Sequence, residues 1–203
     1  MSGKQLTNND FVSYLRRHRD LDRINAAQNK ITRFPYPDLL NFSQTLIHLN
    51  LENNKISDIS EESIRQIPNI QLLKFRGNIL TKLPDSLFSL ASLKVLDVSC
   101  NRLTVFSPKV SLLRQLRLLN IAENQLENLP NSLGYLASLE SITCEFFIYL
   151  ADQRQSNNHQ FKFTMPIMID SELDWVTKFH RRMTMACNGS DLRFRRLMAF
   201  MRQ

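Results

Sequence analysis

Histidine and cysteine are the side chains in this sequence best suited to binding a metal or acting as nucleophiles, but their spacing supports neither role. They are His18, His48, His159, His180, Cys100, Cys144 and Cys187. No histidine lies three or four residues from another histidine or a cysteine, as compact zinc motifs require. The chain has four glycines and lacks both a phosphate-binding glycine loop and a nucleophile-elbow motif. We therefore predict no catalytic residue, no metal, no cofactor and no small-molecule substrate, and a protein that is not an enzyme.

A different chemistry, recognition of another protein, is indicated by side chains that alternate with inward-facing leucines. Residues 93–103 have the form L-x-x-L-x-L-x-x-N-x-L. The alternation at the centre has the two-residue period of a strand. Leu96 and Val98 are therefore predicted to point inward, while Val95, Asp97 and Ser99 point outward. Any specificity of this segment is expected to lie in those three outward side chains.

The same form recurs along the chain, so each copy positions its own set of outward side chains. Residues 116–126 repeat it in the same register, 23 residues later. Five full copies are present, and a sixth begins at Leu139 but has Phe147 where the asparagine should be. The asparagines of the full copies are Asn29, Asn54, Asn78, Asn101 and Asn124. Self-similarity with this period predicts a solenoid in which each turn contributes one strand to a parallel sheet.

The asparagine of each copy stands where the chain leaves the strand and must turn. Its amide can both donate hydrogen bonds to backbone groups and accept them, so stacked copies are expected to form a buried ladder. A buried polar group left unpaired costs roughly 1–3 kcal/mol, which gives the asparagine a structural role.

The segments between the strands carry a second pattern, with apolar residues three or four apart. Residues 83–90 and 129–136 begin with Leu-Pro, and proline can start a short helical turn. Residues 59–67 are one residue longer and lack the Leu-Pro pair. We predict strands on one side of the stack and short helical or 3-10 turns on the other, with the sheet on the shorter, concave side.

The outward strand positions form the candidate functional surface. Leu72, Val95 and Leu118 occupy the same position in three successive copies and make an apolar stripe among polar and charged neighbours. This composition is typical of a protein-binding site. The alternatives are a solvated strand face with tolerated aliphatic residues, or aliphatic residues covered by the C-terminal segment. The predicted partner-binding residues are Arg23, His48, Leu72, Lys74, Arg76, Val95, Asp97, Leu118 and Asn120.

Residues 20–150 resemble the leucine-rich-repeat proteins. The form Leu-Pro-x-x-Leu-x-x-Leu-x-x-Leu at residues 83–93 and 129–139 is similar to the intracellular Ras-group type, which includes Ras suppressor. The first two copies depart from that form. The resemblance implies a non-enzymatic scaffold or adaptor in signalling, which binds a protein partner on its concave sheet. By the same analogy, that partner would be a component of a small-GTPase pathway.

The segments that flank the repeats are predicted to cap them. Residues 1–19 contain an amphipathic helix with Phe11 and Leu15 on its apolar face, which would cover the open end of the solenoid. Residues 151–203 leave the repeat pattern. Within them, residues 160–165 alternate like an edge strand, and two helical segments follow. The predicted fold is thus an α/β solenoid, a curved leucine-rich-repeat stack with helical caps at both ends.

The formal net charge of +7 lies mainly outside the repeats. Residues 151–203 carry nine Lys/Arg against five Asp/Glu, whereas residues 21–150 carry 13 against 12. The basic segment is open to three interpretations: a solvated cap, a helix on a membrane surface, or a contact to a partner or to nucleic-acid phosphate. The candidate tail contacts are Arg181, Arg182, Arg193, Arg195 and Arg196.

The sequence also predicts where the protein works. Its first residues lack the apolar segment of a secretory signal, and no run of about 18 apolar residues exists. Three cysteines with no close pair suit reduced thiols, and Cys100 and Cys144 are expected to be packing residues. We expect a cytoplasmic protein, with the nucleus as the alternative.

Overall fold

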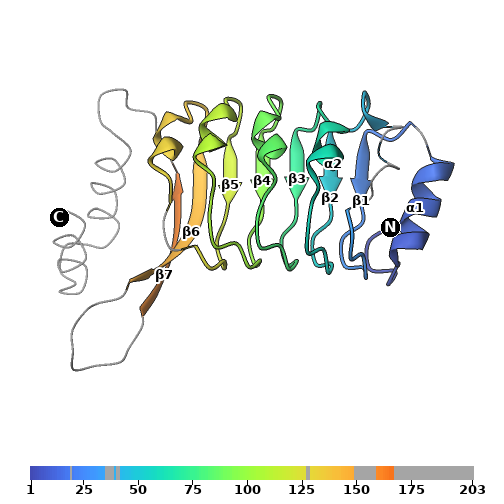
Figure 1. The fold of residues 1–203 in the computed structure, drawn as a ribbon, viewed down its shortest axis with the longest axis horizontal. Coiled ribbons are helices and arrows are strands. Elements are labelled where there is room, and N and C mark those ends of the chain that lie inside the picture. Colours follow the sequence, from blue (N-terminus) through green and yellow to red (C-terminus); the bar gives the residue numbers. More distant parts are fainter. Residues whose placement is uncertain (19, 35–38, 40–41, 127–128, 149–158, 167–203) are drawn as a thin grey trace.

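A computed structural model of the chain describes residues 1–18, 20–34, 39, 42–126, 129–148 and 159–166. Six strands lie parallel in one sheet in chain order, and a seventh pairs antiparallel at the end (Figure 1). The strands are β1 (Arg23–Asn25), β2 (His48–Asn50), β3 (Leu72–Lys74), β4 (Val95–Asp97), β5 (Leu118–Asn120), β6 (Ser141–Ile148) and β7 (His159–Pro166). The helical elements are α1 (Asn8–Arg17), α2 (Glu61–Arg65) and the 3-10 turns η2 (Asp85–Ser89), η3 (Pro108–Leu112) and η4 (Asn131–Tyr135).

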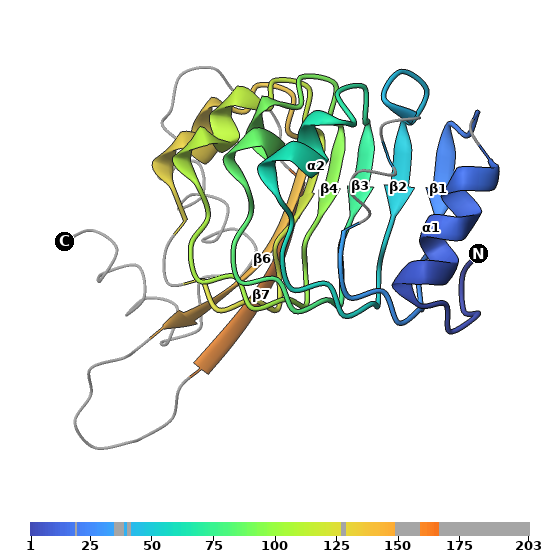
Figure 2. The same cartoon turned by 45° about the vertical axis from the view of Figure 1, so that its right-hand side comes forward.

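The sheet and the short helical elements form two opposite sides of the stack, as Figure 2 shows. Pro84 and Pro130 directly precede η2 and η4, and Pro108 is the first residue of η3. Residues 59–67, which lack Leu-Pro, instead contain the α-helix α2, and the hydroxyl of its N-cap Ser60 accepts a hydrogen bond from Ser63 N at 3.2 Å. The predicted arrangement of strands and helical turns is therefore confirmed.

Inward residues at the centre of each strand build the core between these two sides. Leu49, Leu73 and Leu96 are Cα partners in successive strands, and their side chains have no exposed surface. The same register continues through Leu119 and Ile142. Because the alternation is fixed by this buried row, the neighbouring side chains of every strand face outward together.

The asparagine ladder is present as predicted. The Asn101 Nδ2 donates to Val98 O at 3.0 Å and to Phe75 O of the preceding turn at 2.9 Å. Its Oδ1 accepts from Leu80 N at 3.0 Å. Asn29, Asn54 and Asn78 are buried in the same way, and Asn124 is half-buried. In the later four copies each amide thus satisfies backbone groups of two turns at once, whereas Asn29 binds Leu6 N and Met1 O of the N-terminal segment.

The residue before each ladder asparagine adopts a left-handed backbone conformation. These residues are Gln28, Asn53, Gly77, Cys100 and Glu123, with φ between 52° and 67°. Glycine adopts this conformation without strain, and side-chain-bearing residues pay about 1–2 kcal/mol for it. At Gly77 an added Cβ would also lie 2.3 Å from Asn53 Oδ1. The hydrogen bonds of the ladder therefore offset the conformational free energy that the left-handed residue costs in the turn after each strand.

The two ends of the repeat stack differ. Helix α1 covers the N-terminal end and buries Phe11 and Leu15 against the core, as predicted. Its first turn is fixed by Asp10, which accepts from Thr7 N at 2.8 Å and Thr7 Oγ at 2.7 Å. These hydrogen bonds hold the pKa of Asp10 below its ordinary value.

At the other end, the sixth copy does not turn. Phe147 replaces the ladder asparagine, and β6 runs on for eight residues to pair with β7, from Ser141 opposite Pro166 to Ile148 opposite His159. The predicted edge strand at residues 160–165 is thus confirmed. The helices predicted after residue 170 and the candidate tail contacts (Arg181, Arg182, Arg193, Arg195 and Arg196) lie outside the described residues.

Substituting Asn101→Ala should lower the free energy of unfolding by roughly 2–3 kcal/mol, because it leaves buried backbone groups of two turns without partners. Urea denaturation measures this. Asn69→Ala is the matched control, since Asn69 is exposed and makes one hydrogen bond, to Gln44 O. The control should change stability by less than about 0.5 kcal/mol. Equal effects of the two substitutions would contradict the structural role of the ladder.

Candidate protein-binding face

The apolar stripe predicted from the repeats exists as one row on the outer face of the sheet. Leu72 is the Cα partner of Val95, and Val95 is the Cα partner of Leu118. Leu72 and Val95 are half-buried, and Leu118 has 44% of its surface exposed. Leu118 is therefore the member of the row most available for contact.

A depression of ≈240 Å³ lies on this face beside Leu118. It spans the outward side chains of β3 to β6 and combines aliphatic and polar groups. Its lining consists of Lys74, Val95, Leu96, Asp97, Leu118, Leu119, Asn120, Ser141 and Thr143. Ser141 and Thr143 were not among the predicted site residues. They stand at the third and fifth positions of the sixth copy, where the positions of each copy are counted from its first leucine or isoleucine, here Leu139. Extending the repeat register through that incomplete copy identifies them.

Asp97 is held in place by three hydrogen bonds. Its Oδ1 accepts from Ser99 N at 3.0 Å and from Ser99 Oγ at 2.6 Å, and its Oδ2 accepts from Asn120 Nδ2 at 3.2 Å. The expectation that Ser99 faces a partner is wrong, because its side chain is fully buried. The strand is only three residues long, so the alternation ends before the seventh position. Ala27 and Ala122, at that position in other copies, are also buried.

The cations near the stripe have different partners. Lys74 Nζ lies 3.7 Å from Glu52 Oε1, and Arg76 donates to Ser99 Oγ at 3.4 Å. Lys94 precedes Val95 and donates to the neutral Gln71 Oε1 at 3.0 Å. Lys94 was not predicted as a site residue because its position lies before the alternating segment.

Arg23 and His48 lie on the same sheet but not at the depression. They are on β1 and β2, in the two turns before the stripe begins. Exposed Arg23 pairs with Asp22 at 3.5 Å. Burial, followed by the positive charge of Arg23, lowers the pKa of His48, so the imidazole is neutral at pH 7. The predicted set therefore divides into a central group on β3 to β5 and these two outlying residues.

The two described cysteines are packing residues rather than reactive thiols. Cys144 is buried, and Cys100 is half-buried with its Sγ 3.1 Å from Glu123 Oε2. Burial and this carboxylate raise the pKa of the Cys100 thiol, which disfavours the nucleophilic thiolate. Within the described ranges, no group of three or more His, Cys, Asp or Glu side chains is arranged to hold a metal ion. Nor does any helix in those ranges have the length and apolar character needed to cross a membrane.

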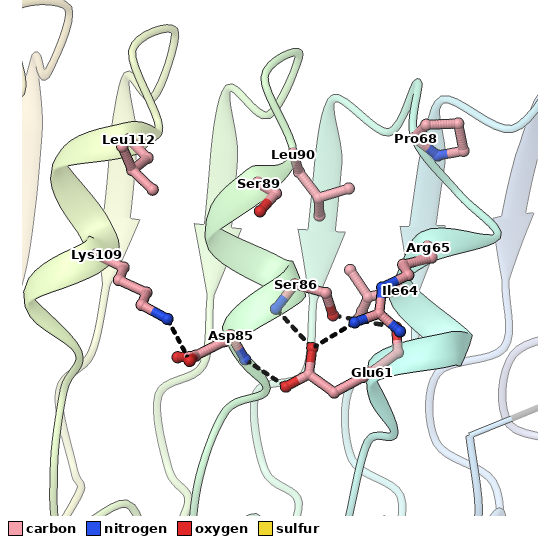
Figure 3. A pocket seen from close by; sticks show the side chains of 10 residues that line it. All are labelled: Glu61, Ile64, Arg65, Pro68, Asp85, Ser86, Ser89, Leu90, Lys109 and Leu112. Atoms are coloured by element: carbon pink, nitrogen blue, oxygen red, sulfur yellow. Dashed lines mark hydrogen bonds and ion pairs between the residues drawn. The ribbon is translucent and has the colours of Figure 1, made fainter.

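A second depression, of ≈450 Å³, lies on the opposite side of the stack between α2, η2 and η3 (Figure 3). Its polar groups bind one another across adjacent turns. The Glu61 carboxylate accepts from Asp85 N and Ser86 N, each at 2.8 Å, and Lys109 forms an ion pair with Asp85. The bonds from Ser86 hold the pKa of Glu61 below its ordinary value. The polar side chains that line this depression therefore have a structural role, because their contacts join three turns of the stack.

Known proteins share this repeat. The family model described as leucine-rich repeat matches residues 71–126 and 91–144, and a second model of that description matches residues 45–67. Lumican of Oryctolagus cuniculus is 33% identical over 110 residues, which cover 48% of this chain and 57% of lumican. Adenylate cyclase of Schizosaccharomyces pombe is 32% identical over 133 residues, or 63% of this chain and 8% of the cyclase.

Solved structures agree with the fold. The structure of a leucine-rich-repeat protein of Leptospira interrogans superposes with a TM-score of 0.57 at 31% identity, over 62% of this chain and 31% of that one. Together with the parallel strands and the ladder, these matches show that the chain is a leucine-rich-repeat protein. None of the three relatives singles out the Ras-group type. The chain spans less than two thirds of the length of each of them.

Substituting Glu61→Gln should lower the free energy of unfolding at pH 7 by about 1 kcal/mol, because a neutral amide replaces a carboxylate that accepts two backbone N–H groups at the start of η2. The side chain is 40% exposed, which limits the effect. Since folding lowers the pKa of Glu61, its contribution is complete above the ordinary value of 4.5 and is lost as the pH falls through the lower folded value.

Chemical denaturation of the wild-type protein and of Glu61→Gln between pH 7 and pH 3 tests this pH dependence. The difference between their free energies of unfolding should shrink on acidification. Glu62→Gln is the control, since Glu62 is its neighbour on α2 and pairs with the exposed Arg65. A difference between wild type and Glu61→Gln that is independent of pH would rule out the carboxylate as its source.

Proposed function

We propose that this protein is a non-enzymatic interaction module, which binds a protein partner on the outer face of its sheet. Leucine-rich-repeat proteins generally mediate protein–protein contacts, and this fold exposes one broad face of short strands for the purpose. The observation that carries the proposal is the aligned row of Leu72, Val95 and Leu118, which ends in a side chain exposed beside a depression.

The composition of the face supports a protein as the ligand. An aliphatic centre with a rim of charged and amide groups is the usual composition of a protein interface, and its core contributes most of the binding free energy. The depression is below the usual size range of small-molecule pockets, and it is lined in part by polar side chains already engaged with one another. A side chain of a partner is therefore a better match than a free metabolite.

We also propose that the protein acts in the cytoplasm as a signalling adaptor. The proposal is supported by Cys100 and Cys144, which are free thiols. The narrower resemblance to the Ras group rests on the Leu-Pro turns and stays a prediction, as does a partner from a small-GTPase pathway. Binding of membranes or nucleic acid through the basic tail also stays a prediction. Fractionation of cells that express the full chain should place it in the cytosol; secretion into the medium would refute the localisation.

Substituting Leu118→Glu should reduce retention of the principal partner at least about tenfold in affinity purification with the full chain, because a charge replaces an exposed apolar anchor beside the depression. Stability should change by less than about 1 kcal/mol, since the side chain is already half-solvated.

Leu112→Glu is the matched control, because Leu112 is 52% exposed and lies on η3, on the opposite side of the stack. It should leave partner retention unchanged. Retention that survives Leu118→Glu but is lost with Leu112→Glu would place the interaction on the wrong side of the molecule for this proposal.

A further inference from the structure

The charges around the apolar stripe are unbalanced. In the three turns that carry the stripe, the side chains at the second, third, fifth and seventh positions include four cations and one carboxylate. The cations are Lys74, Arg76, Lys94 and Arg117, and the carboxylate is Asp97. The negative side chains of the face lie mainly in the flanking turns, as Glu52 and Glu140 do.

The positive charge is available to a ligand on one side of the stripe. Lys94 donates to the neutral Gln71, and among the described residues no carboxylate lies within ion-pair distance of it. Arg117 stands one turn further along, where its backbone N donates to Lys94 O at 2.8 Å. Its ion pair with Glu140 joins side chains that are 60% and 56% exposed. Exposed pairs contribute little, so Arg117 can exchange this partner for another carboxylate.

The single carboxylate does not cancel this charge. Asp97 stands on the other side of Val95 and already accepts three hydrogen bonds from Ser99 and Asn120. Ser141, in register with Leu118, and Thr143, in register with Asn120, add two hydroxyls to the lining of the depression. A ligand thus meets the Lys94 ammonium and the Arg117 guanidinium along one edge of the stripe, and aliphatic side chains at its centre. The other edge carries a row of charged and polar side chains, which are Lys74 (paired with Glu52), Asp97, Asn120 and Thr143.

Building on the proposed function, we propose that this face binds an extended segment of a partner in which aliphatic side chains are flanked by carboxylates. An aliphatic side chain enters the depression between Val95 and Leu118. A neighbouring carboxylate pairs with Lys94 and Arg117. The hydroxyls of Ser141 and Thr143 are placed to bind polar groups of the segment. Nucleic acid fits less well, because the depression has no aromatic side chain on which a base could stack.

The test uses the full chain and three fluorescent synthetic peptides with one Leu-x-Leu centre, flanked on both sides by Asp, Asn or Lys. Fluorescence anisotropy should show that the Asp-flanked peptide binds roughly tenfold more tightly than the Asn-flanked one and that the Lys-flanked peptide binds most weakly. Raising the salt concentration should reduce these differences. Lys94→Glu should abolish the preference for Asp, whereas Lys82→Glu, an exposed lysine outside the strands, should leave it intact.

The possible results distinguish failure of this proposal from failure of the proposed function, protein binding on the sheet face. If Leu118→Glu weakens all three peptides but their affinities are equal, the acidic segment is refuted and the binding face stands. Undetectable binding of the Asp-flanked peptide at millimolar concentration also refutes the acidic segment. If an oligothymidylate binds more tightly than any peptide and depends equally on Lys94, the face recognises polyanions and the proposal is wrong. If binding depends on Leu112 instead of Leu118, the face itself is wrong.

Discussion

The buried side-chain amide of the ladder asparagine is the interaction on which the remaining structure depends. At Asn101 it binds Val98 O in its own turn and both Phe75 O and Leu80 N in the turn before. One amide therefore closes a turn and fixes its position against the neighbour. A shift of one residue between turns would leave these buried groups unpaired, so the turns stack in a single register. Phe147 shows the converse: without the amide, the strand continues.

This register brings side chains that are 23 to 25 residues apart in the sequence together on the candidate binding face. Leu72, Val95 and Leu118 become neighbours only because the ladder aligns their strands. The opposite side of the stack uses its polar groups differently. There the Glu61 carboxylate caps η2 of the next turn, and its lining residues bind one another. The helical side thus holds adjacent turns together, while the candidate binding face lies on the sheet.

Much of this architecture could be predicted from the sequence, because inward residues and asparagines recur at a fixed spacing. The strands, the helical turns after Pro84 and Pro130, and the change of structure at Phe147 all follow from that spacing. Burial of Ser99 could not be predicted in the same way. It depends on the chain turning away from the strand at Cys100, which has a left-handed backbone conformation. A cysteine does not indicate this conformation in a sequence, whereas a glycine would. The role of Lys94 also depends on the actual neighbours of its ammonium group, which the repeat does not determine.

Site-specific photocrosslinking in cells would show whether a partner is recognised on the sheet or on the helical side. A photoreactive benzophenone amino acid would replace Leu118 in one protein and Leu112 in another, two leucines of similar exposure on opposite sides. If recognition occurs on the sheet, position 118 should give a discrete crosslinked partner and position 112 should give none. Crosslinking of the same partner from position 112, with none from position 118, would contradict recognition on the sheet.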